Sequence, residues 1–147
     1  MPTKLSRERV IAAEVLREVG AARITDAEAL FKSGRYAAAV YLAGYAVECH
    51  LKTAICHTLH WPELLGMFKV HDLDGLMTYS GFDDQLRTEP AIKASFGKIL
   101  AIWEVEGNNS LRYRKQETVD EATARLFLKC VCDEETGVVP WLRRSIA

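Results

Sequence analysis

The sequence predicts an all-α protein, a single domain built as an up-and-down bundle of four to five main helices. Apolar residues recur at helical spacing in several segments, and helix-capping or helix-ending residues bound those segments. No stretch shows the apolar–polar alternation of a useful strand. The 147 residues suit one domain. We place the core of the bundle at about 25–135, with an N-terminal helical extension and a C-terminal tail.

The first third of the chain predicts helices on both sides of Gly20. One apolar stripe is expected to face the core, formed by Ile11, Val15 and Val19 with Ala12 and Leu16 beside them. Thr25 and Glu28 have the spacing of a capping box, which predicts a restart of the helix there. Gly20 either interrupts the helix or is tolerated within it, and Ser33-Gly34 predicts its end.

A central helix is predicted from about Arg35 to Leu59. Its apolar arc covers more than half the circumference, and a helix of this kind must be surrounded by others. The arc includes Val40, Ala43, Val47, Leu51 and Ala54. Trp61-Pro62 ends the segment, since proline disfavours helical geometry in the residue before it.

Further helices are predicted in the second half. A short helix starts at Asp72 and stops at Ser80-Gly81, and another runs from Pro90, or from as early as Asp83, to Trp103. A capping box at Thr118–Glu121 opens the last long helix, which ends near Thr136-Gly137. Its expected inward residues are Ala122, Leu126, Phe127, Cys130 and Val131. Pro140 predicts that Val138–Ala147 does not simply continue this helix.

Composition excludes several classes of protein. A hydrophobic fraction of 49% with 27% charged residues is typical of a globular protein, and a net charge of −1 gives no general affinity for nucleic acid or anionic membranes. No uncharged run approaches the roughly 20 residues that span a bilayer. The charged N-terminus lacks the pattern of a signal peptide, so we expect a cytoplasmic protein with four reduced cysteines and no membrane association.

An ordered set of motifs resembles the HEPN domain family over roughly residues 25–135. The motifs are Gly34-Arg35-Tyr36 before an alanine-rich helix, Ala46-x-Glu48-x-x-x-Lys52, His71-Asp72-Leu73, a helix ending in Trp103, and Leu111-Arg112-Tyr113 before a capped helix. The resemblance implies a helical bundle that usually dimerises. It also implies action beside a nucleotidyltransferase in a toxin–antitoxin or defence pair, as a metal-independent ribonuclease or as a non-catalytic binding module.

The ribonuclease members of this family carry an arginine followed, after four to six residues, by a histidine. Arg112 stands at the arginine position here, but Glu117, Thr118 and Val119 occupy the places of the histidine. A ribonuclease without its positioned base would lose about 10²–10⁴-fold in rate. We therefore predict no catalytic residue of this kind.

The candidate ligand-binding residues form two groups. Arg112, Tyr113, Arg114 and Lys115 combine positive charge with an aromatic ring, which could hold phosphate and stack a base. The alternative is a solvated helix entrance with Tyr113 packed inward and Arg112 bonding a carboxylate such as Glu48. The second group is Glu48, with Lys52 and His71 as secondary candidates; the alternatives are an ordinary surface ion pair for Glu48 and Lys52, and a histidine that bonds backbone at a helix end for His71.

We predict neither a metal nor a cofactor. His57, His60 and Cys56 hint at a metal site, but Cys130 and Cys132 diverge on their helix and cannot serve one ion. The sequence thus favours a non-catalytic HEPN-like binding module that acts with a nucleotidyltransferase or another effector and binds nucleotide or RNA. One alternative is a degenerate ribonuclease toxin that uses His71 or Tyr113; another is a purely structural helical adaptor. A homodimer is expected, since Trp61, Phe68 and Trp141 look exposed.

Overall fold

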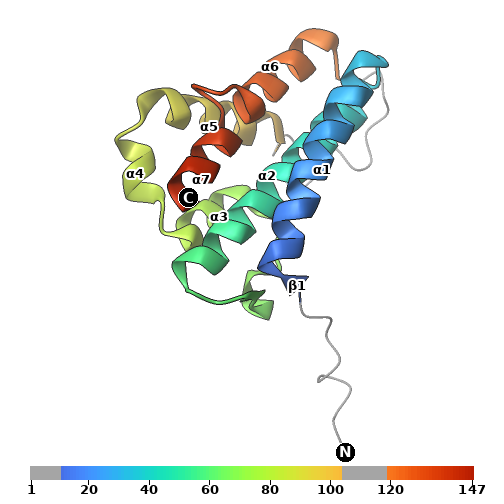
Figure 1. The fold of residues 1–147 in the computed structure, drawn as a ribbon. Coiled ribbons are helices and arrows are strands. Elements are labelled where there is room, and N and C mark those ends of the chain that lie inside the picture. The colour runs from blue at the N-terminus through green and yellow to red at the C-terminus, as the bar shows by residue number, and fades with distance from the viewer. Residues whose placement is uncertain (1–10, 104–118) are drawn as a thin grey trace, which may run out of the picture.

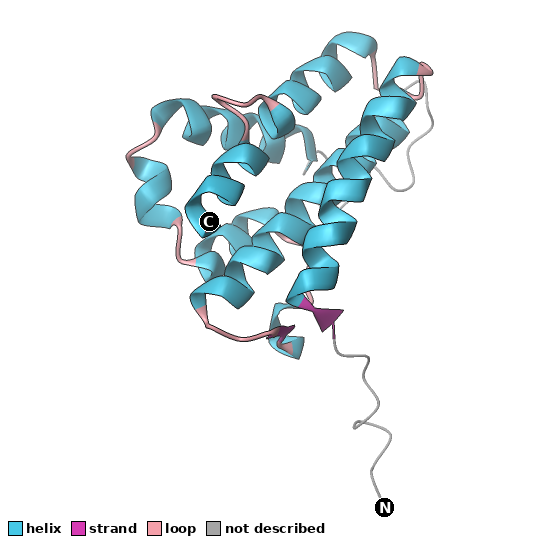
Figure 2. Cartoon of the chain, viewed as in Figure 1, coloured by secondary structure: helices cyan, strands magenta, loops and turns pink. Residues whose placement is uncertain are grey.

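The architecture is helical, as predicted. A computed structural model describes residues 11–103 and 119–147, and within these ranges seven α-helices form a bundle with two very short strands at one end (Figures 1 and 2). The elements in chain order are β1 (Ile11–Ala12), α1 (Ala13–Lys32), α2 (Tyr36–Thr58), β2 (Glu63–Leu64), the 3-10 helix η2 (Gly66–Phe68), α3 (Leu73–Ser80), α4 (Asp83–Arg87), α5 (Pro90–Trp103), α6 (Glu121–Cys132) and α7 (Val138–Ile146).

Helix α2 lies at the centre of the bundle, and its predicted bounds are confirmed within a residue or two. Every residue from Ala46 to Cys56 is buried. Helix α1 lies antiparallel along one side of α2 (Figure 1), after a turn in which Gly34 adopts a φ of 75°. Helices α3, α5, α6 and α7 contact other sides of α2, so the surrounded central helix is confirmed.

Helix α1 is one continuous helix, which decides between the two alternatives for Gly20 and corrects the predicted restart at Thr25. Gly20 is tolerated within it, and the helix does not restart at Thr25. The predicted inward stripe is also wrong: Val15 is exposed, whereas Leu16 is buried. The packing partner decides which face turns inward, because a Cβ on Gly20 would lie only 2.8 Å from the ring of His50.

The two short strands are not predicted by the sequence. Ile11 of β1 pairs with Leu64 of β2 in an antiparallel register. Two residues are too few to show a period of two, so no alternation could be recognised. The pairing joins the start of α1 to the segment that follows α2, above a small cluster of Leu16, Cys56 and Leu64.

Helices α3, α4 and α5 agree with the sequence except at one boundary. Helix α3 ends at Gly81, whose φ of 79° is the left-handed conformation expected there. Residues 83–87 form a separate short helix, α4, and α5 begins at Pro90.

The C-terminal part differs more from the prediction. The side chain of Asp120 caps α6 by accepting from the backbone N–H of Thr123 at 2.7 Å, while Thr118 lies outside the described residues. Ala122 and Leu126 are exposed rather than inward. Helix α6 ends at Cys132, and the expected tail forms α7 with Pro140 in its first turn, where a missing N–H costs nothing.

Trp103, the last residue of α5, packs against residues of both α2 and α6. Its ring stacks on Tyr41 of α2 with centroids 5.9 Å apart and on Phe127 of α6 at 6.3 Å. A Cβ built on Gly44 would overlap this ring. Gly44 therefore sets how closely α5 approaches α2.

Gly44→Ala is expected to lower the free energy of unfolding by about 2–3 kcal/mol, because the added methyl displaces the Trp103 ring. Gly97→Ala is the matched control: a Cβ there meets nothing within 4 Å, so the substitution should stabilise α5 by about 0.5–1 kcal/mol. Urea denaturation checks both values. Equal effects at the two glycines would contradict the role of Gly44.

His50 is a buried titratable residue between α1 and α2. Its side chain bonds the carbonyl oxygen of Ala46 through Nδ1 at 2.7 Å, and its Nε2 has no partner among the described residues. Burial lowers the pKa of His50 to about 4, and the charge of Arg143 acts in the same direction. The folded protein therefore holds this imidazole neutral.

The stability of the protein is expected to fall as the pH decreases from 6.5 to about 4, because the unfolded chain binds a proton at His50 that the folded chain excludes. The full contribution, about 3 kcal/mol, is present above pH 6.5. Urea midpoints measured across this window check it. His50→Gln should lose this component of the pH dependence, and an unchanged dependence would contradict the assignment.

Candidate functional site

The centre of the candidate site is the carboxylate of Glu48, in the middle of α2. Its side chain is only 4% exposed, and both oxygens are engaged. Lys52 Nζ donates to Oε2 at 3.1 Å, and His71 Nδ1 donates to Oε1 at 2.8 Å. The structure therefore brings together three sequence-predicted candidates, and it excludes the interpretation of Glu48 and Lys52 as an ordinary surface pair.

Helix α3 positions the imidazole. Leu73, Leu76 and Met77 are buried in the main core. The hydroxyl of Thr58 donates to the carbonyl oxygen of Ser80 at 2.6 Å, which holds the far end of α3 against the end of α2. His71 precedes the N-cap of α3, so the same packing holds its ring at Glu48. The alternative of a helix-end histidine that bonds only backbone is wrong.

Because Glu48 and Lys52 are buried, each charge depends on its partners in the cluster for stabilisation. Lys52 is 8% exposed and Glu48 less, so water cannot solvate either charge well. A buried ion loses several kcal/mol of hydration, which is offset only when its partners and hydrogen bonds are in place. The cluster is thus expected to contribute less to the free energy of folding than apolar side chains of the same size would.

The outward part of the cluster is the imidazole of His71, whose side chain is 49% exposed. Since Nδ1 carries the hydrogen donated to the carboxylate, Nε2 is the remaining ring nitrogen. No described residue bonds Nε2. It can accept a hydrogen bond in the neutral ring, donate one in the charged ring, or take up a proton.

Two neighbouring groups on α2 are held in their neutral forms. Burial raises the pKa of the Cys49 thiol to about 11, and the Glu48 carboxylate adds to this shift. Burial also raises the pKa of Tyr45. Because the thiolate is the reactive form of cysteine, Cys49 is not a nucleophile at neutral pH.

The basic segment Arg112, Tyr113, Arg114 and Lys115 lies outside the described residues. The predicted pairing of Arg112 with Glu48 therefore stays a prediction. Within the described residues, Trp103 packs on Gly44, one helical turn from Glu48.

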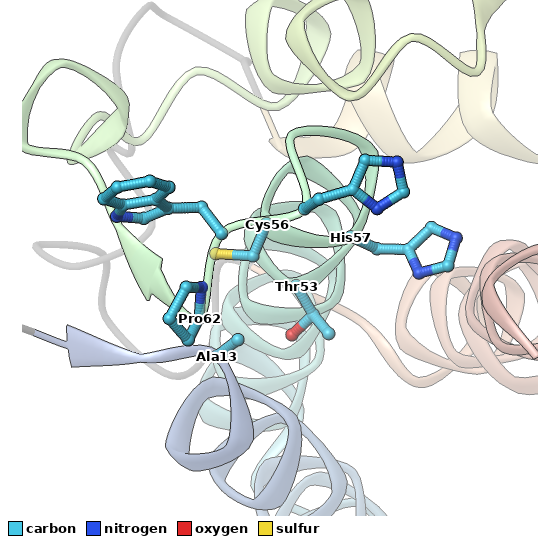
Figure 3. Close-up of a pocket in the computed structure, with 7 residues that line it drawn as sticks. Ala13, Thr53, Cys56, His57 and Pro62 are labelled. Carbon is cyan, nitrogen blue, oxygen red and sulfur yellow. The ribbon is translucent and has the colours of Figure 1, made fainter.

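The link between Glu48 and His71 was missed by sequence reasoning, which treated the two residues separately. They are 23 positions apart, and no local spacing relates them. The hint of metal at His57, His60 and Cys56 is not supported. Figure 3 shows the Cys56 thiol and the His57 ring pointing in different directions. Within residues 11–103 and 119–147 no three potential ligands gather as a metal site would need.

Comparison with protein-family models, with curated proteins and with solved structures finds no match to this chain. The resemblance to HEPN domains thus stays a prediction from the motifs. Among the described helices, none is both long enough and apolar enough to cross a membrane.

Lys52→Met is expected to lower the free energy of unfolding by about 3 kcal/mol, because it removes one of the two partners of a buried carboxylate. The double variant Glu48→Leu with Lys52→Met should recover most of this loss, since it buries no unpaired charge. Urea denaturation measures both. Arg87→Met is the control, because Arg87 pairs with Asp84 on an exposed surface and should matter by less than about 1 kcal/mol. An equally small effect of Lys52→Met would contradict the buried network.

Proposed function

We propose that this protein is a non-catalytic helical binding module whose site, centred on Glu48, binds nucleotide or RNA. The observation that carries the proposal is the buried Glu48 carboxylate shared by Lys52 and His71. A buried ionic cluster is a poor way to add stability, since apolar side chains of similar volume often do better. A role in ligand binding would explain why the protein has this ionic cluster in place of apolar side chains.

The chemistry of the cluster favours an anionic ligand. Its solvent-facing group is an imidazole fixed by a carboxylate, which in the charged form donates a hydrogen bond to phosphate. The basic residues Arg112, Arg114 and Lys115 are the proposed phosphate contacts, and Tyr113 the proposed stacking platform for a base. Their proximity to Glu48 is part of the proposal, since these four residues lie outside the described part of the chain.

The partners proposed for this module follow from the resemblance to HEPN domains. They are a second copy of the chain and a nucleotidyltransferase or other effector, in a cytoplasmic toxin–antitoxin or defence pair. Exposed apolar side chains support self-association, and those of Leu65 and Met67 lie close together in the sequence. Trp141, expected to be exposed, is buried and does not contribute.

A metal-independent ribonuclease is the second candidate function, and one observation favours it. A carboxylate that orients Nδ1 of a histidine, with Nε2 on the accessible side, is the arrangement that general-base histidines use. In such a reaction His71 would take the proton of a ribose 2′-hydroxyl, and that oxygen would attack the adjacent phosphorus. The P–O5′ bond would break, giving a 2′,3′-cyclic phosphate and a 5′-hydroxyl whose proton comes from water. Arg112 would hold the phosphate.

Binding and cleavage of a labelled single-stranded RNA, measured in the presence of a chelator, test these functions. We expect saturable binding without cleavage, weakened about tenfold by Arg112→Ala or His71→Ala because each removes a charge-assisted contact. Arg87→Ala, at an exposed ion pair, should bind like the unchanged protein.

Three outcomes separate the candidates. Cleavage that disappears in His71→Ala would establish the ribonuclease and overturn the non-catalytic module. Absence of any RNA or nucleotide binding would leave the purely structural adaptor. Circular dichroism of each variant ensures that a loss of binding is not a loss of folding.

A further inference from the structure

A second hollow lies away from Glu48, between the start of α1 and the end of α2 (Figure 3). We propose that it binds a planar aromatic ring that carries an anionic group, the chemistry of a nucleoside monophosphate. This site is independent of the one centred on Glu48. The proposal depends on the shape of the hollow, on an exposed tryptophan and on an unpaired arginine.

The hollow consists of two adjoining parts. One has a volume of about 400 Å³ and is lined by Ala13, Thr53, Cys56, His57, His60, Trp61 and Pro62. The other has a volume of about 270 Å³ and is lined by Ala13, Glu14, Arg17 and Thr53. Because Ala13 and Thr53 line both, the two parts adjoin, and we take them together as one crevice that is open to solvent.

One wall of the crevice is the segment His60–Pro62, which follows α2 and lies outside any helix or strand. His60 has a φ of 52°, a left-handed conformation uncommon for a residue with a side chain, and it turns the chain back at the end of α2. The N–H of Trp61 donates to the carbonyl oxygen of Cys56 at 3.0 Å. The carbonyl oxygen of Pro62 accepts from the N–H of Ala13 at 2.8 Å, which ties the wall to α1.

The aromatic end of the crevice is at Trp61. Its side chain is 52% exposed, whereas Trp103 and Trp141 are buried. An exposed indole beside a hollow offers a face on which a planar ring can stack. His57 and His60 at the rim add ring nitrogens that can bond polar edges of such a ring.

The anionic end is at Arg17. It lies one helical turn, about 6 Å, from Ala13 in the middle of the crevice. Arg17 is exposed and has no ion-pair partner among the described residues. Placing the anion here also keeps it away from the C-terminus of α2, whose dipole would repel it. Glu14, between the two ends, can accept hydrogen bonds from sugar hydroxyls.

Titration of the full chain with AMP, followed by calorimetry and by tryptophan fluorescence, tests the proposal. We expect saturable binding that quenches the fluorescence of Trp61, loss of this binding component in Trp61→Ala, and about tenfold weaker affinity of the same component in Arg17→Ala. Adenosine, which lacks the phosphate, should bind equally to the unchanged protein and to Arg17→Ala. The matched controls Tyr79→Ala and Arg87→Ala remove an exposed ring and an exposed cation elsewhere and should bind AMP normally.

Absence of saturable AMP binding, or binding that Trp61→Ala leaves unchanged, would overturn the proposal. AMP binding that is lost in His71→Ala but kept in Trp61→Ala would assign the nucleotide to the Glu48 site and would equally overturn it. RNA binding that His71→Ala weakens and Trp61→Ala leaves unchanged reports on the Glu48 site. Failure of one site is thereby distinguished from failure of the other.

Discussion

The burial of α2 is the constraint on which the rest of the structure depends. From Ala46 to Cys56 no residue of this helix has more than slight contact with solvent. Small side chains and Gly44 let neighbouring helices approach closely, as the contact of Trp103 with Gly44 illustrates. Any polar group on α2 must then find its partner inside the protein, because an unpaired buried polar group is costly.

The polar residues of α2 meet this constraint in different ways. His50 stays neutral and bonds a backbone carbonyl within its own helix, so it needs no other helix. Thr53 likewise donates to the carbonyl oxygen of Cys49. Glu48 is charged and has two oxygens to satisfy, one of which reaches His71 beyond the helix. Of these three residues, only Glu48 bonds a side chain that reaches solvent, that of His71, and we therefore place the function at Glu48 and His71.

The success of the sequence predictions depends on how local each feature is. Gly34 and Gly81 end helices through their own backbone conformation, and both ends were predicted correctly. Val138–Ala147 does not continue the preceding helix, as predicted from Pro140, but the separate helix α7 was not predicted. Proline ends a helix in its interior but fits its first turn, and only the position of the helix distinguishes these cases. Val15 and Leu16 are neighbours of similar hydrophobicity, so the inward face of α1 could not be chosen from the pattern.

The sequence by itself determined that this protein is a helical bundle around the segment from Arg35 to Leu59, since helical periodicity and helix ends are properties of short stretches of chain. It also singled out Glu48, Lys52 and His71 as polar residues in notable places. Only the tertiary structure decided that these three form one cluster around a buried carboxylate, and that Trp61 and Arg17 line adjoining hollows. Such contacts join residues far apart in the chain, and their formation depends on how whole helices pack rather than on any local pattern.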